Sequence, residues 1–150
     1  GFKTFRNSRK QSKRKKNMPN RKRVRSGVQW EDIVAYSRAV QVGNVIEVAG
    51  TTAVNKQGEF VGENDPYEQT LFIIRKAEEA LNELGADLSD VIRTRIYVTN
   101  IEDWETVGKA HGDCFRGIYP VTTLVEVSRL IDARLLVEIE FSAVMREVIE

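Results

Sequence analysis

PVTTLVEVSRLIDARLLVEIEFSAV, residues 120–144, is the stretch that decides the fold. Apolar and polar residues alternate in it twice, first over residues 121–128 and again over residues 135–144. Alternation with a period of two is the pattern of a β-strand whose two faces differ. The second run has an unbroken apolar face, which consists of Leu135, Val137, Ile139, Phe141 and Ala143. The stretch therefore predicts two successive strands, the second with one face in the core.

Three glutamates lie within these strands, Glu126, Glu138 and Glu140. One face of an antiparallel sheet can be solvated, so each of them could simply face water. Burial of an unpaired carboxylate is unfavourable, so the alternative is a polar cleft or a subunit interface that pairs or solvates them. The sequence leaves both interpretations open.

A hairpin is predicted nearer the N-terminus. Residues 36–42 and 45–49 alternate, and Gly43-Asn44 between them favours a tight two-residue turn. Gly50 follows, either as an ordinary strand end or as a position where another group approaches the backbone. Residues 56–59 predict a further turn, and a short strand beside it is left open.

Two helices are predicted from apolar spacing. In the first, Asn64 or Asp65 can cap the N-terminus, Pro66 fits the first turn and Gly85 ends the helix. Its apolar stripe is Leu71, Ile74, Ala77, Leu81 and Leu84. The second runs from a cap at Asp103 to about residue 116, with Trp104, Val107, Cys114 and Phe115 on its apolar side. Gly108 and Gly112 each cost about 0.5–1 kcal/mol relative to alanine there, so they need a reason such as close packing or room for a ligand.

Between the helices, residues 91–99 form a strand pattern. Its expected core face is Ile92, Thr94, Ile96 and Val98. The complete order of elements predicts an α+β domain in which two helices cover one face of a sheet. The second face of that sheet must then be covered by something else.

The charge is distributed unevenly along the 150 residues. Residues 1–25 hold twelve of the 23 basic residues and none of the 22 acidic ones, so residues 26–150 carry a formal charge of about −11. The basic segment lacks an apolar period, which predicts a leader that is disordered or ordered only by another chain or an anion. Residues 26–150 are the predicted domain.

The leader has two interpretations. It could be a nucleic-acid-binding or targeting arm, or residues 1–17 could be vector or upstream sequence that precedes Met18-Pro19. We favour the second. No apolar stretch is long enough to span a membrane, and Cys114 is the single cysteine, so we expect a cytoplasmic protein without an internal disulfide. Cys114 could be a nucleophile, although a small core residue is the favoured interpretation.

Four segments together carry a family resemblance: AYSRAVQVGNVIEVAG (35–50), VIRTRIYVTNIEDWETVGKAH (91–111), YPVTTLVEVSRL (119–130) and LLVEIEFSAV (135–144). With the helix between them, they resemble the Rid (YjgF) family. Known members of this family are small homotrimers with a chorismate-mutase-like mixed sheet, so the resemblance implies the same fold and assembly here. Known members hydrolyse reactive enamines and imines. Older descriptions call relatives endoribonucleases or translation inhibitors.

The resemblance implies a site that is only partly retained. Tyr36, Gly50 and Glu138 match a family tyrosine, a ligand-contacting glycine and the acid that positions water. Thr122 stands in place of the substrate-binding arginine, and Gly108 in place of an asparagine. Leu124 replaces a cysteine, and Ala49 a common serine. The chain therefore resembles the branch that lacks the deaminase arginine.

His111, the only histidine, is a further candidate. Its ordinary pKa near neutrality suits an acid or base, although a single helical histidine is more often structural. We therefore name Glu138 and Tyr36 as candidate catalytic residues, and Gly50, Thr122, Gly108 and His111 as candidate substrate-binding residues. No metal or other cofactor is expected.

Three functions compete. The first is a homotrimer that binds or hydrolyses a small enamine, imine or carbonyl compound between subunits. The second is RNA binding or cleavage, which the basic leader favours and the acidic body opposes. The third is a non-catalytic regulatory trimer. We favour the first, with a small-molecule ligand and neither membrane nor nucleic acid as partner.

Overall fold

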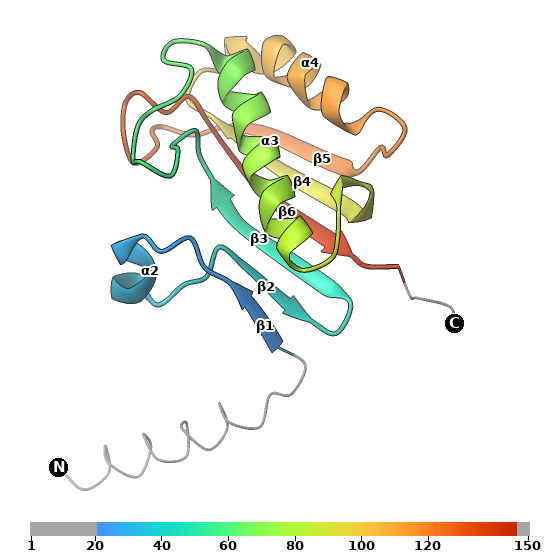
Figure 1. Ribbon diagram of the computed structural model, residues 1–150. Coiled ribbons are helices and arrows are strands. Elements are labelled where there is room, and N and C mark those ends of the chain that lie inside the picture. The colour runs from blue at the N-terminus through green and yellow to red at the C-terminus, as the bar shows by residue number, and fades with distance from the viewer. Residues whose placement is uncertain (1–20, 147–150) are drawn as a thin grey trace, which may run out of the picture.

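The structure is a computed structural model that describes residues 21–146 (Figure 1). One six-stranded sheet has the order β1-β2-β3-β6-β4-β5. The strands are β1 (Arg21–Val24), β2 (Ala39–Val42), β3 (Val45–Thr51), β4 (Val91–Val98), β5 (Val121–Glu126) and β6 (Val137–Val144). The helices are α2 (Gln29–Val34), α3 (Pro66–Glu83) and α4 (Trp104–Phe115), with short 3-10 helices η1 (Leu88–Asp90) and η2 (Ile101–Asp103).

The sheet is mixed. β4 and β5 pair in parallel, and every other neighbouring pair is antiparallel. A parallel pair needs a crossover connection, which α4 provides between β4 and β5. The remaining antiparallel pairs include the predicted hairpin, in which Gly43 at the turn has a φ of +60°. The predicted α+β class is thus confirmed.

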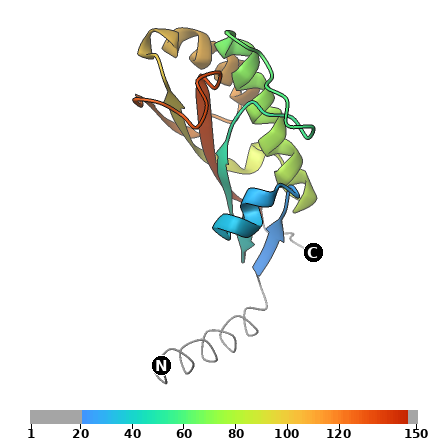
Figure 2. The same cartoon turned by 90° about the vertical axis from the view of Figure 1, so that its left-hand side faces the viewer.

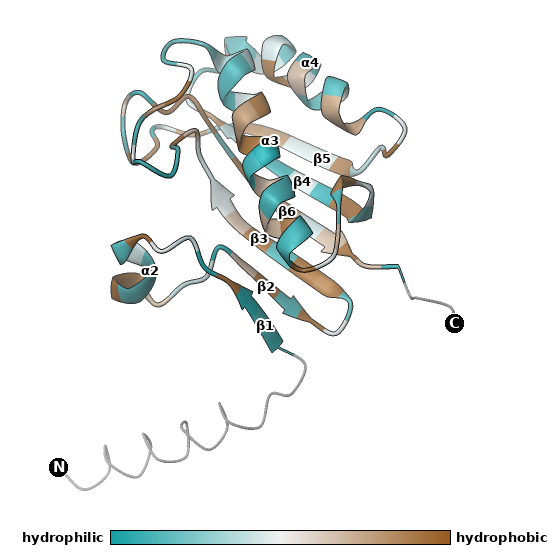
Figure 3. Cartoon of the chain, in the orientation of Figure 1, coloured by the Kyte–Doolittle hydropathy of each residue, from teal (hydrophilic) through white to brown (hydrophobic). Residues whose placement is uncertain are grey.

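Two helices, α3 and α4, cover one face of the sheet and pack on each other. Figure 2 shows α3 along one side, whereas the opposite side of β6 and β4 carries no helix of the described residues. The apolar residues gather on the strands and on one side of α3 (Figure 3). None of the helices within residues 21–146 is long and apolar enough to cross a membrane.

α3 forms where the sequence predicts it. The Asp65 side chain accepts a hydrogen bond from the backbone N–H of Glu68 at 3.1 Å, and Pro66 occupies the first turn. Gly85 adopts a φ of +81°, which lets the chain leave the helix. Ile73, Ile74, Ala77, Ala80 and Leu81 are buried along it. The helix is therefore held by its cap and by one buried stripe.

The central strand β6 confirms the pattern that opened the sequence analysis. Leu135 before it and all four predicted residues within it, Val137, Ile139, Phe141 and Ala143, are almost completely buried. This strand lies between β3 and β4 and therefore contributes its apolar face to the centre of the core.

In β4 the prediction for one residue is wrong. Thr94, Ile96 and Val98 are buried as expected, but Ile92 is 51% exposed. The pairing with β6 shifts between Val91 and Arg93, so Val91 takes the buried place. An irregularity of one residue reverses which side chains face the core.

The predicted boundary at residue 25 is also corrected. Arg21–Val24 forms edge strand β1, which pairs antiparallel with β2 and buries Val24. Main-chain hydrogen bonding to β2 accounts for this strand, because three of its four residues are basic and exposed. The short helix α2 was not predicted. Residues 1–20, which hold the rest of the leader, lie outside the described residues.

The apolar side of α4 is only partly as predicted. Val107 and Phe115 are buried, whereas Trp104 at the first position is 54% exposed. Cys114 is half-buried and packs against the core, in agreement with its favoured interpretation as a small core residue.

Candidate functional site

The candidate residues fall into two groups. What we call the glutamate group consists of Gly50 near the end of β3, Glu138 on β6 and Tyr36 between α2 and β2. Thr122 and His111 meet Thr94 in what we call the threonine group, between α4, β4 and β5. Gly108 lies on α4, three residues before His111.

Gly50 and Glu138 are in direct contact. The pairing of β3 with β6 is irregular between Val48 and Thr51, and Gly50 lies in this irregular part. A Cβ atom on Gly50 would collide with Oε2 of Glu138. Glycine at this position therefore makes the room in which the Glu138 carboxyl group lies.

Arg38 supports this arrangement from the segment before β2. Its Nη2 atom donates a hydrogen bond of 2.7 Å to the carbonyl oxygen of Gly50. Burial lowers the pKa of Arg38, and the negative charges that Tyr36, Glu31 and Glu138 can carry oppose that shift. Arg38 thus links Tyr36 electrostatically with Gly50 and Glu138.

The Glu138 carboxyl group is harder to ionise than an ordinary glutamate. Partial burial raises its pKa, the neighbouring Glu140 raises it further, and Arg38 partly offsets both. A carboxyl group with a raised pKa can donate and accept protons closer to neutral pH. Glu138 therefore has the electrostatic setting of an acid or base.

The two other glutamates of the opening stretch differ from Glu138. Glu140 lies 3.9 Å from Arg95 and accepts a hydrogen bond from Tyr97, whose pKa this bond raises. Glu126 is exposed and accepts a hydrogen bond of 3.0 Å from the backbone N–H of Ile101. Glu140 is thus paired on what we call the bare face, the side of β6 and β4 that carries no helix of the described residues. Glu126 is solvated.

The threonine group is a compact set of hydrogen bonds. Oγ1 of Thr94 lies 2.9 Å from Nε2 of His111 and 2.8 Å from Oγ1 of Thr122, and the last two atoms are 3.4 Å apart. Burial lowers the pKa of His111, which keeps the ring neutral at pH 7. Its centroid is 4.6 Å from that of Phe115. His111 packs against Phe115, with one ring nitrogen directed at two hydroxyl groups.

Thr94 was predicted only as a core residue. Its side chain is completely buried, yet it is the residue that joins His111 to Thr122. The only signal in the sequence is a hydroxyl group at a core position of a strand, since a buried hydroxyl group needs a hydrogen-bond partner.

Gly108 is exposed, and a Cβ atom there would meet nothing within 4 Å. Close packing against the described residues therefore does not explain this glycine.

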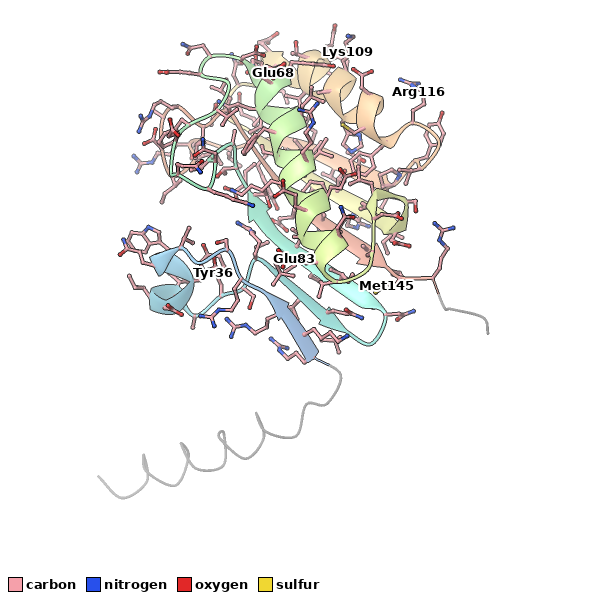
Figure 4. All side chains as sticks on the ribbon, viewed as in Figure 1. Tyr36, Glu68, Glu83, Lys109, Arg116 and Met145 are labelled. Carbon is pink, nitrogen blue, oxygen red and sulfur yellow. The ribbon has the colours of Figure 1, made fainter. Side chains whose placement is uncertain are left out.

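The glutamate and threonine groups are separate within one chain. Glu138 pairs with Tyr97 of β4, whereas Thr122 pairs with Thr94, three positions away. An odd separation directs the two sets of side chains to opposite faces, and the strand spacings put the Cα atoms of Glu138 and Thr122 roughly 14 Å apart. Figure 4 likewise shows Tyr36 far from Lys109 and Arg116, which flank His111 on α4. One copy of the chain does not bring the candidate residues together.

Comparisons with known proteins agree with this architecture. Residues 27–145 match the family Endoribonuclease L-PSP. An uncharacterized protein of Streptomyces coelicolor, SCO2049, is 44% identical over 122 residues, which are 81% of this chain and 90% of that protein. A 2-iminobutanoate/2-iminopropanoate deaminase of Dermatophagoides farinae is 31% identical over 67% of this chain and 78% of that protein.

A solved structure shows the same fold. Rv2704 of Mycobacterium tuberculosis, a member of the YjgF/YER057c/UK114 family, superposes with a TM-score of 0.76 at 46% identity, over 83% of this chain and 99% of that one. The mixed sheet with two covering helices is thus the YjgF-like α+β fold. The chain belongs to the Endoribonuclease L-PSP family, which is the Rid (YjgF) family that its sequence resembles.

Proposed function

We propose that this chain forms a homotrimer in which the glutamate group of one copy faces the threonine group of the next. The cleft between them binds or hydrolyses a small enamine, imine or related carbonyl compound. Two observations support the assembly: the candidate residues lie on opposite faces of one sheet, and the face that carries Glu138 has no helix over β6 and β4 in the described part.

The contact of Glu138 with Gly50 is the observation that carries the chemistry. In hydrolysis, a water molecule held by the Glu138 carboxylate adds to the carbon of the C=N bond while the carboxylate takes one of its protons and passes it to the imine nitrogen. When the adduct collapses, Glu138 moves the hydroxyl proton to the same nitrogen, so that ammonia leaves and a carbonyl compound remains. The raised pKa of Glu138 suits both proton transfers. Tyr36, held in the same electrostatic cluster, is the second polar group near the reacting atoms.

The substrate differs from a simple 2-imino acid, because the position of the family arginine is occupied by Thr122. A guanidinium group binds a carboxylate with two charge-assisted hydrogen bonds. One such bond contributes about 1.5–3 kcal/mol, so its loss weakens binding by about ten- to a hundredfold. The Thr122 hydroxyl group is already engaged with Thr94 and His111. The chain is therefore a poor 2-aminoacrylate-type deaminase.

Hydrolysis of imines from small amino acids tests this proposal. We expect kcat/KM of the wild type below about 10⁴ M⁻¹s⁻¹, within the lower range of enzymes. Thr122→Arg should raise it, and Glu138→Gln in the same background should abolish the gain. Thr123→Arg is the matched control, since the neighbouring side chain points to the other face of β5.

A wild type with efficient imino-acid hydrolysis would contradict the assignment of Thr122, because another cation would then bind the carboxylate. The role of Glu138 would be contradicted if Thr122→Arg lost imine hydrolysis while Glu138→Gln kept the turnover of the wild type. A trimer that binds no imine or carbonyl compound would support the non-catalytic alternative.

RNA binding is the second candidate, and the exposed basic residues Arg21, Lys22 and Arg23 of edge strand β1 favour it. Its test is binding of the full chain to single-stranded RNA over a range of salt concentrations. Affinity that falls steeply with salt and is lost when these three residues become glutamine would support this function.

A further inference from the structure

A cavity of about 740 Å³ lies on the helix-covered side of the sheet. None of the candidate site residues lines it, although Arg38, which supports Gly50 of the glutamate group, does. Its walls come from α3, from the end of β1 and from residues 54–57. This volume falls within the usual range of ligand pockets. The proposed function does not use the cavity.

Two cations face each other at this cavity, Arg38 and Lys76, and both line it. Each is partly buried, and the charge of Arg38 disfavours the charge of Lys76. Neither forms a salt bridge with any carboxylate of the described residues. Glu31 and Glu138 attract Arg38, and Glu79 attracts Lys76, but no carboxylate of the described residues contacts either cation directly. Two partly buried like charges without a direct ion pair are unfavourable, so an anion bound between them would be stabilised.

Both cations have donors to spare. Lys76 Nζ donates to the carbonyl oxygens of Val54 at 2.9 Å and Thr52 at 3.4 Å, which leaves one of its three N–H groups. Arg38 gives Nη2 to Gly50, but its Nε–H is buried without a partner in the described part of the chain. A buried unpaired donor is rare, so the Arg38 guanidinium group is incompletely paired within the described residues.

The rest of the lining is mixed. Val24, Val54 and Phe72 give the cavity apolar surface. Three exposed cations also line it: Arg25, Lys56 and Arg75. Glu79 and Glu83 of α3 also line it and are exposed, and Glu79 attracts Lys76. The cavity therefore combines buried positive charge with apolar wall, while its acidic residues remain in contact with water.

We propose that this cavity binds a small organic anion, with its carboxylate or phosphate group between Arg38 and Lys76 and its carbon body against Phe72 and Val54. Charge-assisted hydrogen bonds to the spare donors give the affinity, and the apolar walls select an anion with a short hydrocarbon part over an inorganic ion.

The test uses the full chain and three probes with the same carbon chain: hexanoate, monohexyl phosphate and 1-hexanol. The melting temperature is measured against ligand concentration up to 20 mM, with potassium chloride added to equal ionic strength. At ten times the Kd, a bound anion should raise the Tm by about 3–6 °C. Hexanol should give no rise, and the anion with the lower Kd shows whether the site takes carboxylates or phosphates.

Lys76→Met, which keeps the side-chain length and removes the charge, should raise the Kd at least tenfold. The matched control Lys109→Met removes an exposed lysine of α4 and should leave the Kd unchanged. If Lys76→Met does not fold, the exposed Lys56→Met decides instead, with an increase of at least threefold in Kd as the supporting result.

Absence of a rise above 1 °C for both anions in the wild type would overturn the proposal. An unchanged Kd in Lys76→Met, or in Lys56→Met when that variant decides, would also overturn it. Binding in the cleft of the proposed function would survive Lys76→Met, so the two proposals fail separately.

Discussion

Gly50 shows how one missing side chain positions a candidate catalytic group. Its Cα faces the Glu138 carboxyl group, which is the far end of a flexible side chain. We expect Gly50→Ala to displace that carboxyl group at little cost in stability, within about 1 kcal/mol, and to reduce ligand binding or turnover as much as Glu138→Gln does. Chemical denaturation and steady-state kinetics measure the two effects.

Gly108→Ala is the matched comparison, because a Cβ atom there enters open space on an exposed helix surface. This variant should gain about 0.5–1 kcal/mol of stability from helix propensity. A large loss of stability in Gly50→Ala, or a loss in Gly108→Ala, would show that these glycines serve the packing of the chain.

The raised pKa of Glu138 predicts how the stability of the protein depends on pH. Its pKa is raised in the folded protein, so between the ordinary value near 4.5 and the raised value the folded state binds more protons than the unfolded state. The free energy of unfolding therefore falls as pH rises through this window. Glu138→Gln removes this contribution, so the variant should gain stability relative to wild type on going from pH 4 to pH 7.

Denaturant titrations of both proteins at several pH values measure that difference. A constant difference, or one of opposite sign, would contradict the raised pKa. Glu140→Gln is a useful control, because removal of the neighbouring negative charge should reduce the pH effect of Glu138 without eliminating its burial.

At the scale of the secondary-structure element, β4 offers a test of the shifted pairing. Ile96 is buried at the centre of the strand, whereas Ile92 is half-exposed beside the irregularity. Ile96→Ala should lower the free energy of unfolding by about 2–5 kcal/mol, and Ile92→Ala by less than about 1 kcal/mol. Equal losses would indicate that the regular alternation of the sequence continues through residue 92.

At the scale of the whole molecule, the proposed trimer predicts a mass. Three copies of the 17.1 kDa chain have a mass of about 51 kDa. Light scattering coupled to size exclusion should give this value at micromolar concentration.

The bare face carries Arg95, Tyr97, Glu138 and Glu140, so an interface formed by this face is polar. Arg95→Glu should weaken the assembly, because it places a like charge beside Glu140. A monomer of constant mass over the whole concentration range would exclude the intersubunit cleft.

Local sequence patterns determined the parts of this protein that depend on neighbours along the chain. The cap of α3, the Gly43-Asn44 hairpin and the apolar face of β6 were predicted correctly. The stripe of α3 was predicted in part, because Ile74, Ala77 and Leu81 are buried as expected, whereas Leu71 is only half-buried and the buried Ile73 and Ala80 were missed. Each rests on a periodicity or a turn residue whose effect extends over a few residues. The family resemblance added the candidate residues but not their positions in space.

Tertiary structure alone decided the rest. β1 has almost no apolar pattern and forms because β2 offers it a backbone partner, and Ile92 leaves the core because β4 and β6 pair irregularly. Thr94 meets His111 and Thr122 only after α4 has crossed to β5, and Gly50 meets Glu138 only because β3 and β6 are neighbours. These contacts join residues far apart in the chain, and pairing between strands is set by the whole sheet rather than by either strand's own sequence.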